Sequence, residues 1–334
     1  MPPLAPRKLA LVAFGGNALI RRGEEGTQTE QIENSDRLAR RLAWFAESGY
    51  DLLLVHGNGP QVGNILIQVE EAVTKVPPLS LDVCVAQSEG SIGYLLARSL
   101  DNALAARRIR REVVCFVTEV LVDGRDPGFR KPTKPIGPFY TKYRAEYLMK
   151  RMGWLMVEDS GRGYRKVVAS PRPRKVLALA AIREGLRRGW VIIAGGGGGI
   201  PVYRSEDGRL RGIEAVIDKD YTAGLLATEL QADLFVILTG VDQVFLNFGR
   251  PDQVRAHRLS VAEAKHHLRE GQFPPGSMGP KIETAVGFAE TIGHEVLITS
   301  VDRLKEALAG KAGTRIVPDE RRAPRRTTGR GRRR

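Results

Sequence analysis

The sequence predicts an α/β fold in which helices cover a largely parallel sheet. Short runs of β-branched and aliphatic residues alternate with longer helical patterns along most of the 334 residues, which is typical of parallel strands joined by helical crossovers. Glycine clusters follow three of these apolar runs, as expected where a strand turns sharply into a helix. A composition of 42% hydrophobic and 27% charged residues is that of a globular protein.

The first third of the chain alternates regularly. The expected elements are strands at 9–14, 51–56 and 113–118 and helices at 32–48, 61–74 and 81–108. Pro60 is well placed to open the second helix, because a first helical turn does not need its missing N–H. The pattern then changes between residues 123 and 165, which are rich in Pro, Gly and Lys. A structureless loop of that length would be unusual, so we expect an inserted lid subdomain.

The alternation resumes after this insertion, and no internal repeat is evident. We expect a helix at 175–188, a strand at 191–194, a hairpin at 202–213, a helix at 221–230, a strand at 234–238, a hairpin at 244–258, helices at 260–270 and 281–291 and a strand at 295–298.

The net charge of +14 is concentrated at one end of the chain. Residues 321–334 contain eight arginines and no acidic residue, and without them the net charge is +6. The segment has no aromatic residue to stack on bases, and its composition cannot sustain a packed core. We interpret it as a solvated extension, with a nucleic-acid- or membrane-binding arm as the alternative.

The cysteine content and the N-terminus both favour a cytoplasmic protein. Cys84 and Cys115 are the only cysteines, too few for a disulfide framework or a four-cysteine zinc site, and both lie among apolar neighbours. We expect them to be buried free thiols. The apolar runs are too short to span a membrane, and the first strand begins too early to leave room for a signal peptide.

The glycine clusters predict an anion-binding crevice. They lie at residues 15–16, 57–59 and 195–199, each at the carboxyl end of an expected strand, where open α/β sheets bind ligands. Glycine there lets backbone N–H groups approach a phosphate or carboxylate. No glycine is followed by the Lys-Ser/Thr pair of a P-loop, and the dinucleotide fingerprint fails because Val62 occupies its last glycine position.

Three lysines are placed where such an anion would need them. Lysine is scarce, with 13 against 39 arginines, yet Lys134, Lys219 and Lys281 each stand beside Pro, Gly or Asp at a loop or an expected helix start. Lone lysines are usually solvated surface residues. Lys219 is different, because Asp218 and Asp220 flank it directly after an apolar run. This arrangement indicates an active-site charge network.

Taken together, these segments resemble the carbamate kinases of the amino-acid-kinase superfamily. The matching stretches include AFGGNAL at 13–19, VHGNGPQVGN at 55–64, PTKPIGPF at 132–139, EAVIDKD at 214–220 and PGSMGPK at 275–281. They run from residue 9 to about 300 in the order of that family. The glycine clusters are shared with acetylglutamate and uridylate kinases, whereas the last three stretches are specific to this branch. Lys131 departs from the pattern, where an asparagine is expected.

The resemblance implies a three-layer αβα sandwich around a mostly parallel eight-stranded sheet, divided into two lobes. Residues 1–215 would form the acceptor lobe, including the lid subdomain at about 123–165. Residues 216–318 would form the nucleotide lobe. The arginine-rich segment at 319–334 lies outside the resemblance, and from its composition we expect it to be a disordered tail. The implied partner is a second copy of the chain in a homodimer. We expect no membrane partner and, from the composition of the tail, we do not expect nucleic acid to be a partner.

The resemblance also assigns the site residues. Lys134 would reach from the lid to the reacting groups, Lys219 and Lys281 would bind the β- and γ-phosphates, and Asp220 would orient these lysines. The residues expected to bind the acceptor are Gly15, Gly16, Asn17, Gly57, Asn58, Gly59, Gly196, Gly197 and Gly198. The residues expected to bind the nucleotide, besides Lys219 and Lys281, are Thr239, Gly240, Val241, Asp242 and Met278. We expect His56 to be a packed histidine at a strand end rather than a base.

The implied reaction is ATP + carbamate = ADP + carbamoyl phosphate, run toward ATP in arginine or related nitrogen catabolism. Carbamate is already deprotonated, so catalysis would rest on positioning and charge neutralisation. Mg²⁺ would be held by ATP oxygens, because no dedicated metal cage is recognisable. Two alternatives remain open at this point: a kinase for another small carboxylate such as acetylglutamate, and a kinase-like regulator that binds nucleic acid through its arginine tail.

Overall fold

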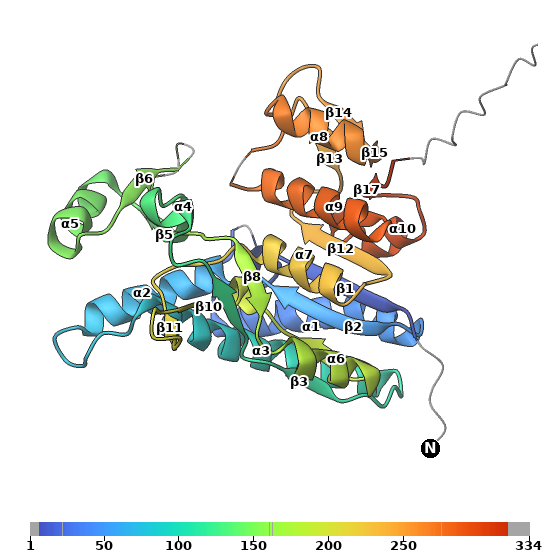
Figure 1. Ribbon diagram of the computed structural model, residues 1–334, viewed down its shortest axis with the longest axis horizontal. Helices are drawn as coiled ribbons and strands as arrows, with labels where there is room; N and C mark the ends of the chain where they lie inside the picture. Colours follow the sequence, from blue (N-terminus) through green and yellow to red (C-terminus); the bar gives the residue numbers. More distant parts are fainter. Residues whose placement is uncertain (1–6, 22, 160, 162, 275, 320–334) are drawn as a thin grey trace, which may run out of the picture.

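A central eight-stranded sheet organises the protein (Figure 1). The computed structural model describes residues 7–319 except 22, 160, 162 and 275. Within these residues the sheet has the order β15-β17-β16-β12-β1-β2-β9-β3. The strands are β1 (Leu9–Phe14), β2 (Asp51–His56), β3 (Val113–Cys115), β9 (Val191–Ile193), β12 (Leu234–Thr239), β15 (Arg258–Ser260), β16 (Val296–Ser300) and β17 (Thr314–Val317). Only the β16–β17 pair is antiparallel among the pairings of this sheet, so the predicted mostly parallel eight-stranded sheet is confirmed.

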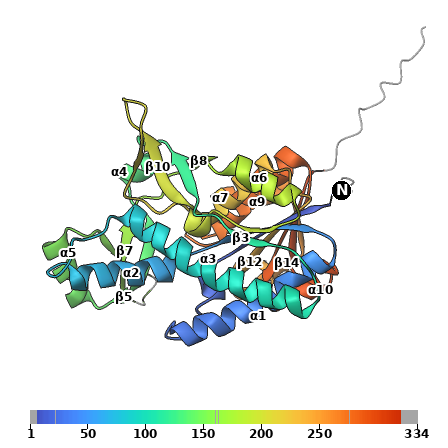
Figure 2. The ribbon, with the colours of Figure 1, turned by 90° about the horizontal axis from the view of Figure 1, so that it is seen from below.

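Both faces of the sheet are covered by helices, which explains why its central strands are continuously apolar. In β1, Leu11 and Ala13 join the core on one face, while Val12 and Phe14 join the core on the other. The helices of the first face are α6 (Leu179–Arg187), α7 (Lys219–Glu229), α8 (Val261–Arg269) and α9 (Met278–Ile292). Those of the second face are α1 (Gln28–Glu47), α3 (Leu81–Ala106) and α10 (Leu304–Leu308). Figure 2 shows α1 and α3 together on one side of the molecule. The three-layer αβα sandwich is thereby confirmed.

Smaller elements surround this sandwich. A second sheet has the order β11-β10-β4-β8, a hairpin pairs β13 with β14, and a third sheet has the order β5-β7-β6. Their bounds are β4 (Glu119–Val122), β5 (Lys134–Tyr140), β6 (Met156–Glu158), β7 (Tyr164–Val168), β8 (Pro173–Val176), β10 (Ile200–Arg204), β11 (Leu210–Gly212), β13 (Val244–Leu246) and β14 (Val254–Ala256). The remaining helical segments are α2 (Gly59–Ala72), α4 (Pro127–Arg130), α5 (Lys142–Met152), η1 (Gly16–Ala18) and η2 (Gly196–Gly198).

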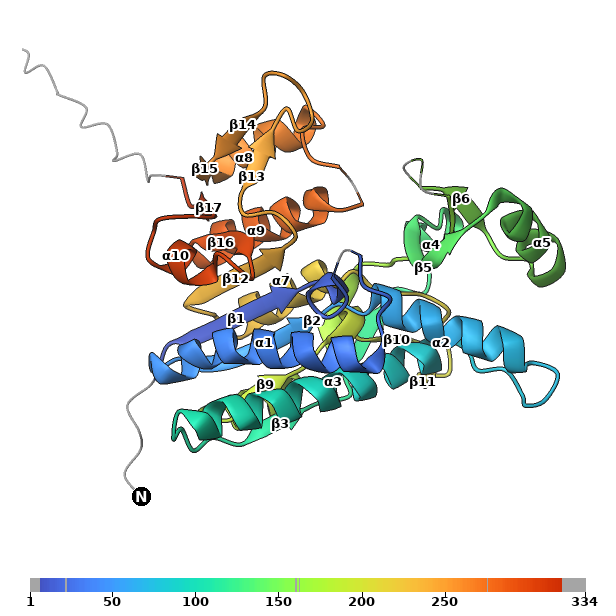
Figure 3. The ribbon, with the colours of Figure 1, turned by 180° about the vertical axis from the view of Figure 1, so that it is seen from behind.

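The strands β5, β6 and β7 and helix α5 form a separate projection, here called the inserted unit. It stands away from the main sheet in Figure 1 and in the rear view of Figure 3. It has a small core of its own, with Ala145, Leu148 and Met156 buried. Its base contacts α2, where a Cβ added to Gly63 would lie 1.9 Å from the Cα of Gly137. The two backbones therefore touch without intervening side chains.

Several element boundaries differ from the prediction. Residues 173–176 form β8, which pairs antiparallel with β4, so the helix expected from residue 175 begins at Leu179. Helix α1 begins at Gln28, four residues earlier than expected, because Thr27 and Glu30 form a capping box. Cys84 is buried and Cys115 partly so, and both are free thiols. Across the described chain, no helix combines the length and apolarity needed to cross a membrane.

Candidate active site

The three predicted glycine clusters lie at one edge of the sheet. They follow β1, β2 and β9, which are consecutive neighbours in the strand order, so their carboxyl ends meet. A Cβ added to Gly57 would lie 2.9 Å from the backbone N of Gly16, and one added to Gly16 would lie 2.9 Å from Cδ of Pro60. Gly15 precedes η1 and Gly59 begins α2. Asn17 lies within η1, but its side chain is outside the described part of the structure.

The five-glycine run is required by its backbone conformation. Gly195, Gly197, Gly198 and Gly199 have φ of 65°, 65°, 103° and 89°, values that favour glycine strongly. Gly196 is restricted for a different reason, because a Cβ there would lie 2.4 Å from Nε2 of His56. The run therefore packs its backbone directly against neighbouring groups.

Asn58 is held against this run. It is buried, with 3% of its surface exposed, and its Nδ2 donates a hydrogen bond to Oγ of Ser88 at 2.8 Å. A Cβ added to Gly197 would lie 2.1 Å from the same Nδ2. The amide of Asn58 is thus positioned at the floor of the crevice by helix α3.

The three predicted lysines form a network with two aspartates at the start of α7. Nζ of Lys219 donates to Oδ1 of Asp220 at 2.8 Å, and Nζ of Lys281, from the first turn of α9, donates to Oδ2 of Asp220 at 2.9 Å. Lys134, the first residue of β5, forms an ion pair with Asp218. Asp218 caps α7 by accepting the backbone N–H of Asp220 at 3.0 Å. We call these five residues the lysine–aspartate cluster.

This cluster adjoins the glycine clusters. A Cβ added to Gly57 would lie 3.1 Å from Cδ of Lys219, so the lysine stem passes over that turn. Thr222, one turn further along α7, donates its hydroxyl to the backbone carbonyl of Gly198 at 2.7 Å. Segments far apart in the sequence therefore meet, as the motifs predict.

Charge pairing overcomes burial in the cluster. Burial opposes ionisation of Asp220, but Lys219 and Lys281 hold its pKa below the usual range. Burial likewise opposes ionisation of Asp218, yet Lys134 and Lys219 hold its pKa well below normal. The pKa of Lys219 is raised, because Asp220 and Asp218 outweigh its burial, whereas burial and neighbouring Lys219 lower the pKa of Lys281. Three lysines against two carboxylates suit the cluster to an anionic ligand.

A cavity of about 1080 Å³ opens beside the cluster. Gly15 and Lys281 line it, together with four residues predicted to bind nucleotide: Thr239, Gly240, Val241 and Met278. Phe245, Phe248 and Phe273 also line it, giving apolar surface on which a flat base can stack. Asp242 is not among the lining residues, and its carboxylate accepts a hydrogen bond from Ser300 at 2.6 Å instead.

Comparisons with known proteins identify the family. The profile of the Amino acid kinase family matches residues 8–300. The carbamate kinase of Thermococcus kodakarensis is 43% identical over 313 residues, which cover 93% of this chain and 99% of that protein. The chain belongs to the amino acid kinase family. Carbamate kinase 2 of Enterococcus faecalis is 44% identical over 92% of this chain and 98% of its own length. Within the family, the chain therefore belongs to the carbamate kinases.

Solved structures agree with this membership. The structure of carbamate kinase from Giardia lamblia bound to AMP-PNP has a TM-score of 0.87 and 38% identity, and it covers 95% of this chain and 100% of its own. An N-acetylglutamate synthase from Neisseria gonorrhoeae shares the fold alone, with a TM-score of 0.56 and 19% identity over 94% of this chain and 60% of its own. Carbamate kinases are thus similar to this chain over nearly its full length.

His56 is packed in this carbamate kinase, consistent with the role expected from sequence. It is 1% exposed at the end of β2, and burial lowers its pKa to about 4. It is neutral at physiological pH, with its ring against the backbone of Gly196. Nothing in this arrangement brings it to a proton that the reaction needs to move.

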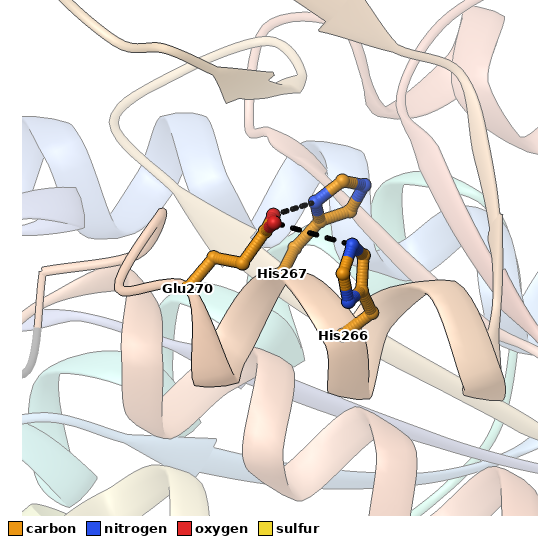
Figure 4. Close-up of side chains that lie close together, drawn as sticks. All are labelled: His266, His267 and Glu270. Carbon is orange, nitrogen blue, oxygen red and sulfur yellow. Dashed lines mark hydrogen bonds and ion pairs between the residues drawn. The ribbon is translucent and has the colours of Figure 1, made fainter.

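Among the described residues, one group of His, Cys, Asp or Glu side chains is close enough to share a metal ion: His266, His267 and Glu270. Figure 4 shows both rings directed at the carboxylate at the end of α8. The nitrogen–oxygen distances are 3.2 and 3.3 Å, as in ordinary side-chain contacts three and four residues apart on a helix. The group contains no member of the lysine–aspartate cluster, and we assign it no metal.

The structure adds residues that the motifs did not reveal. Ser88 and Glu89 on α3 and Thr118 after β3 hold Asn58 and the glycine run at 195–199 in place. We call these segments, together with the other glycine turns, the glycine floor. The aromatic side chains of the β13–β14 hairpin line the cavity. The polar pair at 88–89 interrupts the apolar face of a long helix, which is a signal available in the sequence. The hairpin phenylalanines give no such signal, because they line the cavity only once the hairpin has packed beside segments that are distant in the sequence.

Proposed function

We propose that this carbamate kinase transfers a phosphoryl group between ATP in the cavity and carbamate on the glycine floor, and that it works mainly toward ATP. The observation that carries the proposal is the position of the lysine–aspartate cluster, which lies between the glycine turns and the cavity. Substrates on the glycine turns and in the cavity would both be close to these lysines.

The acceptor side supplies backbone N–H groups and one fixed amide. Gly15, Gly16, Asn17, Gly57, Asn58, Gly59, Gly196, Gly197 and Gly198 are proposed to bind carbamate or the carbamoyl group. Close backbone packing supports this, because side chains at Gly16, Gly57 or Gly197 would clash with neighbouring atoms. Backbone donors fixed before the substrate arrives need no reorganisation as charge develops.

The lysines neutralise the phosphoryl group during its transfer. Lys219 and Lys281 are proposed to hold the β- and γ-phosphates, and Lys134 to reach the reacting oxygens from the inserted unit. Asp220 stays ionised because its pKa is lowered, so it orients both lysines and takes no proton. The carbamate oxygen is already anionic, and no general base is required. Positioning and electrostatic stabilisation then supply the rate acceleration.

The nucleotide is proposed to lie along the cavity, with Thr239, Gly240, Val241 and Met278 around it and Asp242 supporting this segment through its bond to Ser300. Mg²⁺ is proposed to bind to phosphate oxygens of ATP, where it would neutralise their charge. The carboxylates of Asp218 and Asp220 are already occupied by lysines, so the donor set fits a metal carried by the nucleotide rather than a protein cage.

Further properties of the protein remain proposals. We propose that residues 1–215 and 216–318 act as acceptor and nucleotide lobes, and that the protein is cytoplasmic, which its free cysteines support. We also propose a homodimer. Tyr94 and Val117, near the β3 edge of the sheet, are 60% and 58% exposed, and large exposed apolar side chains favour an interface. The predicted arginine-rich tail at 319–334 lies outside the described residues apart from Asp319.

The test is coupled ATP formation from ADP and carbamoyl phosphate. The wild type should be active, and Lys134→Ala should reduce kcat by about three orders of magnitude, because it removes a cation at the reacting group. Lys131→Ala is the matched control: Lys131 is exposed three residues away and should keep activity within about twofold.

An inactive wild type would contradict the proposal, and a panel of other acceptors, acetylglutamate first, would then be the next measurement. Equal losses in the two lysine variants would show that the base of the inserted unit, rather than Lys134 itself, is needed.

A further inference from the structure

A buried carboxyl group lies beneath the glycine floor and has no part in the reaction described above. Glu89, on α3, is 1% exposed. Its Oε2 accepts the backbone N–H of Thr118 at 2.8 Å, and its carboxyl group also interacts with the backbone N–H of Gly196. Among the described residues, its other oxygen, Oε1, has no hydrogen-bond partner.

Glu89 fixes the glycine run at two points. Thr118, which Glu89 holds, accepts the backbone N–H of Gly195 on its hydroxyl at 2.9 Å. Gly196 packs against Glu89, because a Cβ there would lie 3.0 Å from Cγ of Glu89, and its backbone N–H counteracts the rise in the pKa of the Glu89 carboxyl group. The neighbouring Ser88 positions Asn58. One turn of α3 therefore supports both segments that we propose as the acceptor floor.

The surroundings of Glu89 keep its carboxyl group neutral. Burial raises its pKa to about 8, and the two backbone N–H groups only partly oppose this. The titratable groups around it are His56 from β2, which burial keeps neutral with a pKa of about 4, and Cys115 from β3, whose thiol pKa burial raises to about 11. Within the described chain, no ion pair reaches Glu89.

We propose that Glu89 is a positioning residue of the acceptor site: its carboxyl group holds Thr118 and the glycine run in the conformation that binds the acceptor, and the negative charge that it gains on ionisation weakens acceptor binding. The inference rests on the proposed function, in which the glycine run receives carbamate or carbamoyl phosphate. An ionised Glu89 places a negative charge in a dry region directly beneath an anionic substrate, where repulsion is poorly screened. The nucleotide lies farther along the cavity and is affected less.

The test follows ATP formation from pH 7 to 9 in the wild type and in Glu89→Gln. Glutamine keeps an acceptor oxygen for Thr118 and cannot ionise. The apparent KM for carbamoyl phosphate of the wild type should rise about tenfold over this range, as the protonated fraction falls about tenfold. In Glu89→Gln this KM should stay nearly constant and close to the wild-type value at pH 7. The KM for ADP should be alike in both proteins at every pH.

Controls separate the alternatives. Cys115→Ser removes the thiol beside Glu89, whose pKa of about 11 lies above the range of the experiment, and should keep the alkaline rise. Circular dichroism and a thermal melt confirm that each variant is folded. The same alkaline rise in Glu89→Gln as in the wild type, or a constant KM in the wild type, would overturn the role of Glu89 while leaving the kinase assignment intact. A wild type that forms no ATP at any pH would instead overturn the proposed function, and this inference with it.

Discussion

Two carboxylates, one at each end of strand β2, lie between pairs of cationic side chains, and their pKa values are shifted in opposite directions. At the amino end, Asp51 lies between Arg7 and Arg111, with nitrogen–oxygen distances of 3.7 and 3.6 Å. Beyond the carboxyl end, Asp220 lies between Lys219 and Lys281 at 2.8 and 2.9 Å. Burial raises the pKa of Asp51 despite its arginines, whereas the lysines lower the pKa of Asp220 despite deeper burial.

Direct hydrogen bonds account for the difference. Oδ1 of Asp51 has no hydrogen-bond partner within the described residues, because Arg111 directs its guanidinium at the backbone carbonyls of Tyr50 and Ala46. Both oxygens of Asp220 accept from a lysine. Two cations nearby are therefore not sufficient to stabilise a buried carboxylate, and contact at hydrogen-bond distance decides the sign of the pKa shift. The lysines at the carboxyl end therefore keep Asp220 ionised, whereas the arginines at the amino end do not overcome the burial of Asp51.

The largest expected effect is on kcat, which should fall for a substitution at the carboxyl end of β2 but not for one at its amino end. Lys219→Met should lower kcat for ATP formation by about two to three orders of magnitude, because it removes a preorganised cation from the proposed phosphate site. Arg7→Met is the matched variant at the amino end and should keep kcat within about twofold. A loss in Arg7→Met as large as that in Lys219→Met would break the comparison.

The next effect separates them by stability. Asp220→Asn removes the hydrogen-bonded counter-charge of two buried lysines and should lower the free energy of unfolding by about 3–5 kcal/mol. Asp51→Asn removes a carboxylate that is already disfavoured and should change it by less than about 1 kcal/mol. Urea denaturation at pH 7 measures both values. Similar losses in the two variants would mean that hydrogen-bond contact does not decide how much these carboxylates contribute to the free energy of unfolding.

The smallest effect is the pH dependence of the Asp51 variant. The folded-state pKa of Asp51 is raised, so its contribution to stability is present at low pH and is lost as the pH rises through that value. Asp218 and Asp220 have lowered pKa values, and their contribution is lost as the pH falls. The urea midpoint of Asp51→Asn minus that of the wild type should therefore be higher at pH 7 than at pH 4. A constant difference would contradict the raised pKa.

Local patterns in the sequence were enough to predict the fold class and the parts of the site built from short motifs. The glycine turns, Lys219 with its aspartates and Lys281 could be found because each lies within a short stretch at a strand end or helix start. The polar pair at 88–89 marks a break in the apolar face of α3, but the role of Glu89 could not be predicted from it, because that role depends on α3 packing beneath a run more than 100 residues later in the chain. Strand β8 was missed for the same reason, since its pairing with β4 outweighs the helical pattern around residue 175.

The contact between Gly63 and Gly137 limits how this enzyme can evolve. Lys134 lies three residues before Gly137, and the proposed acceptor turn at residues 57–59 lies shortly before Gly63. The touching backbones thus set the spacing between Lys134, proposed to be catalytic, and the proposed acceptor turn. A Cβ at position 63 would meet backbone rather than a movable side chain, so no neighbouring substitution can make room for it. Replacing Gly63 would therefore require the base of the inserted unit to change at the same time. We expect no single substitution at this position to be tolerated.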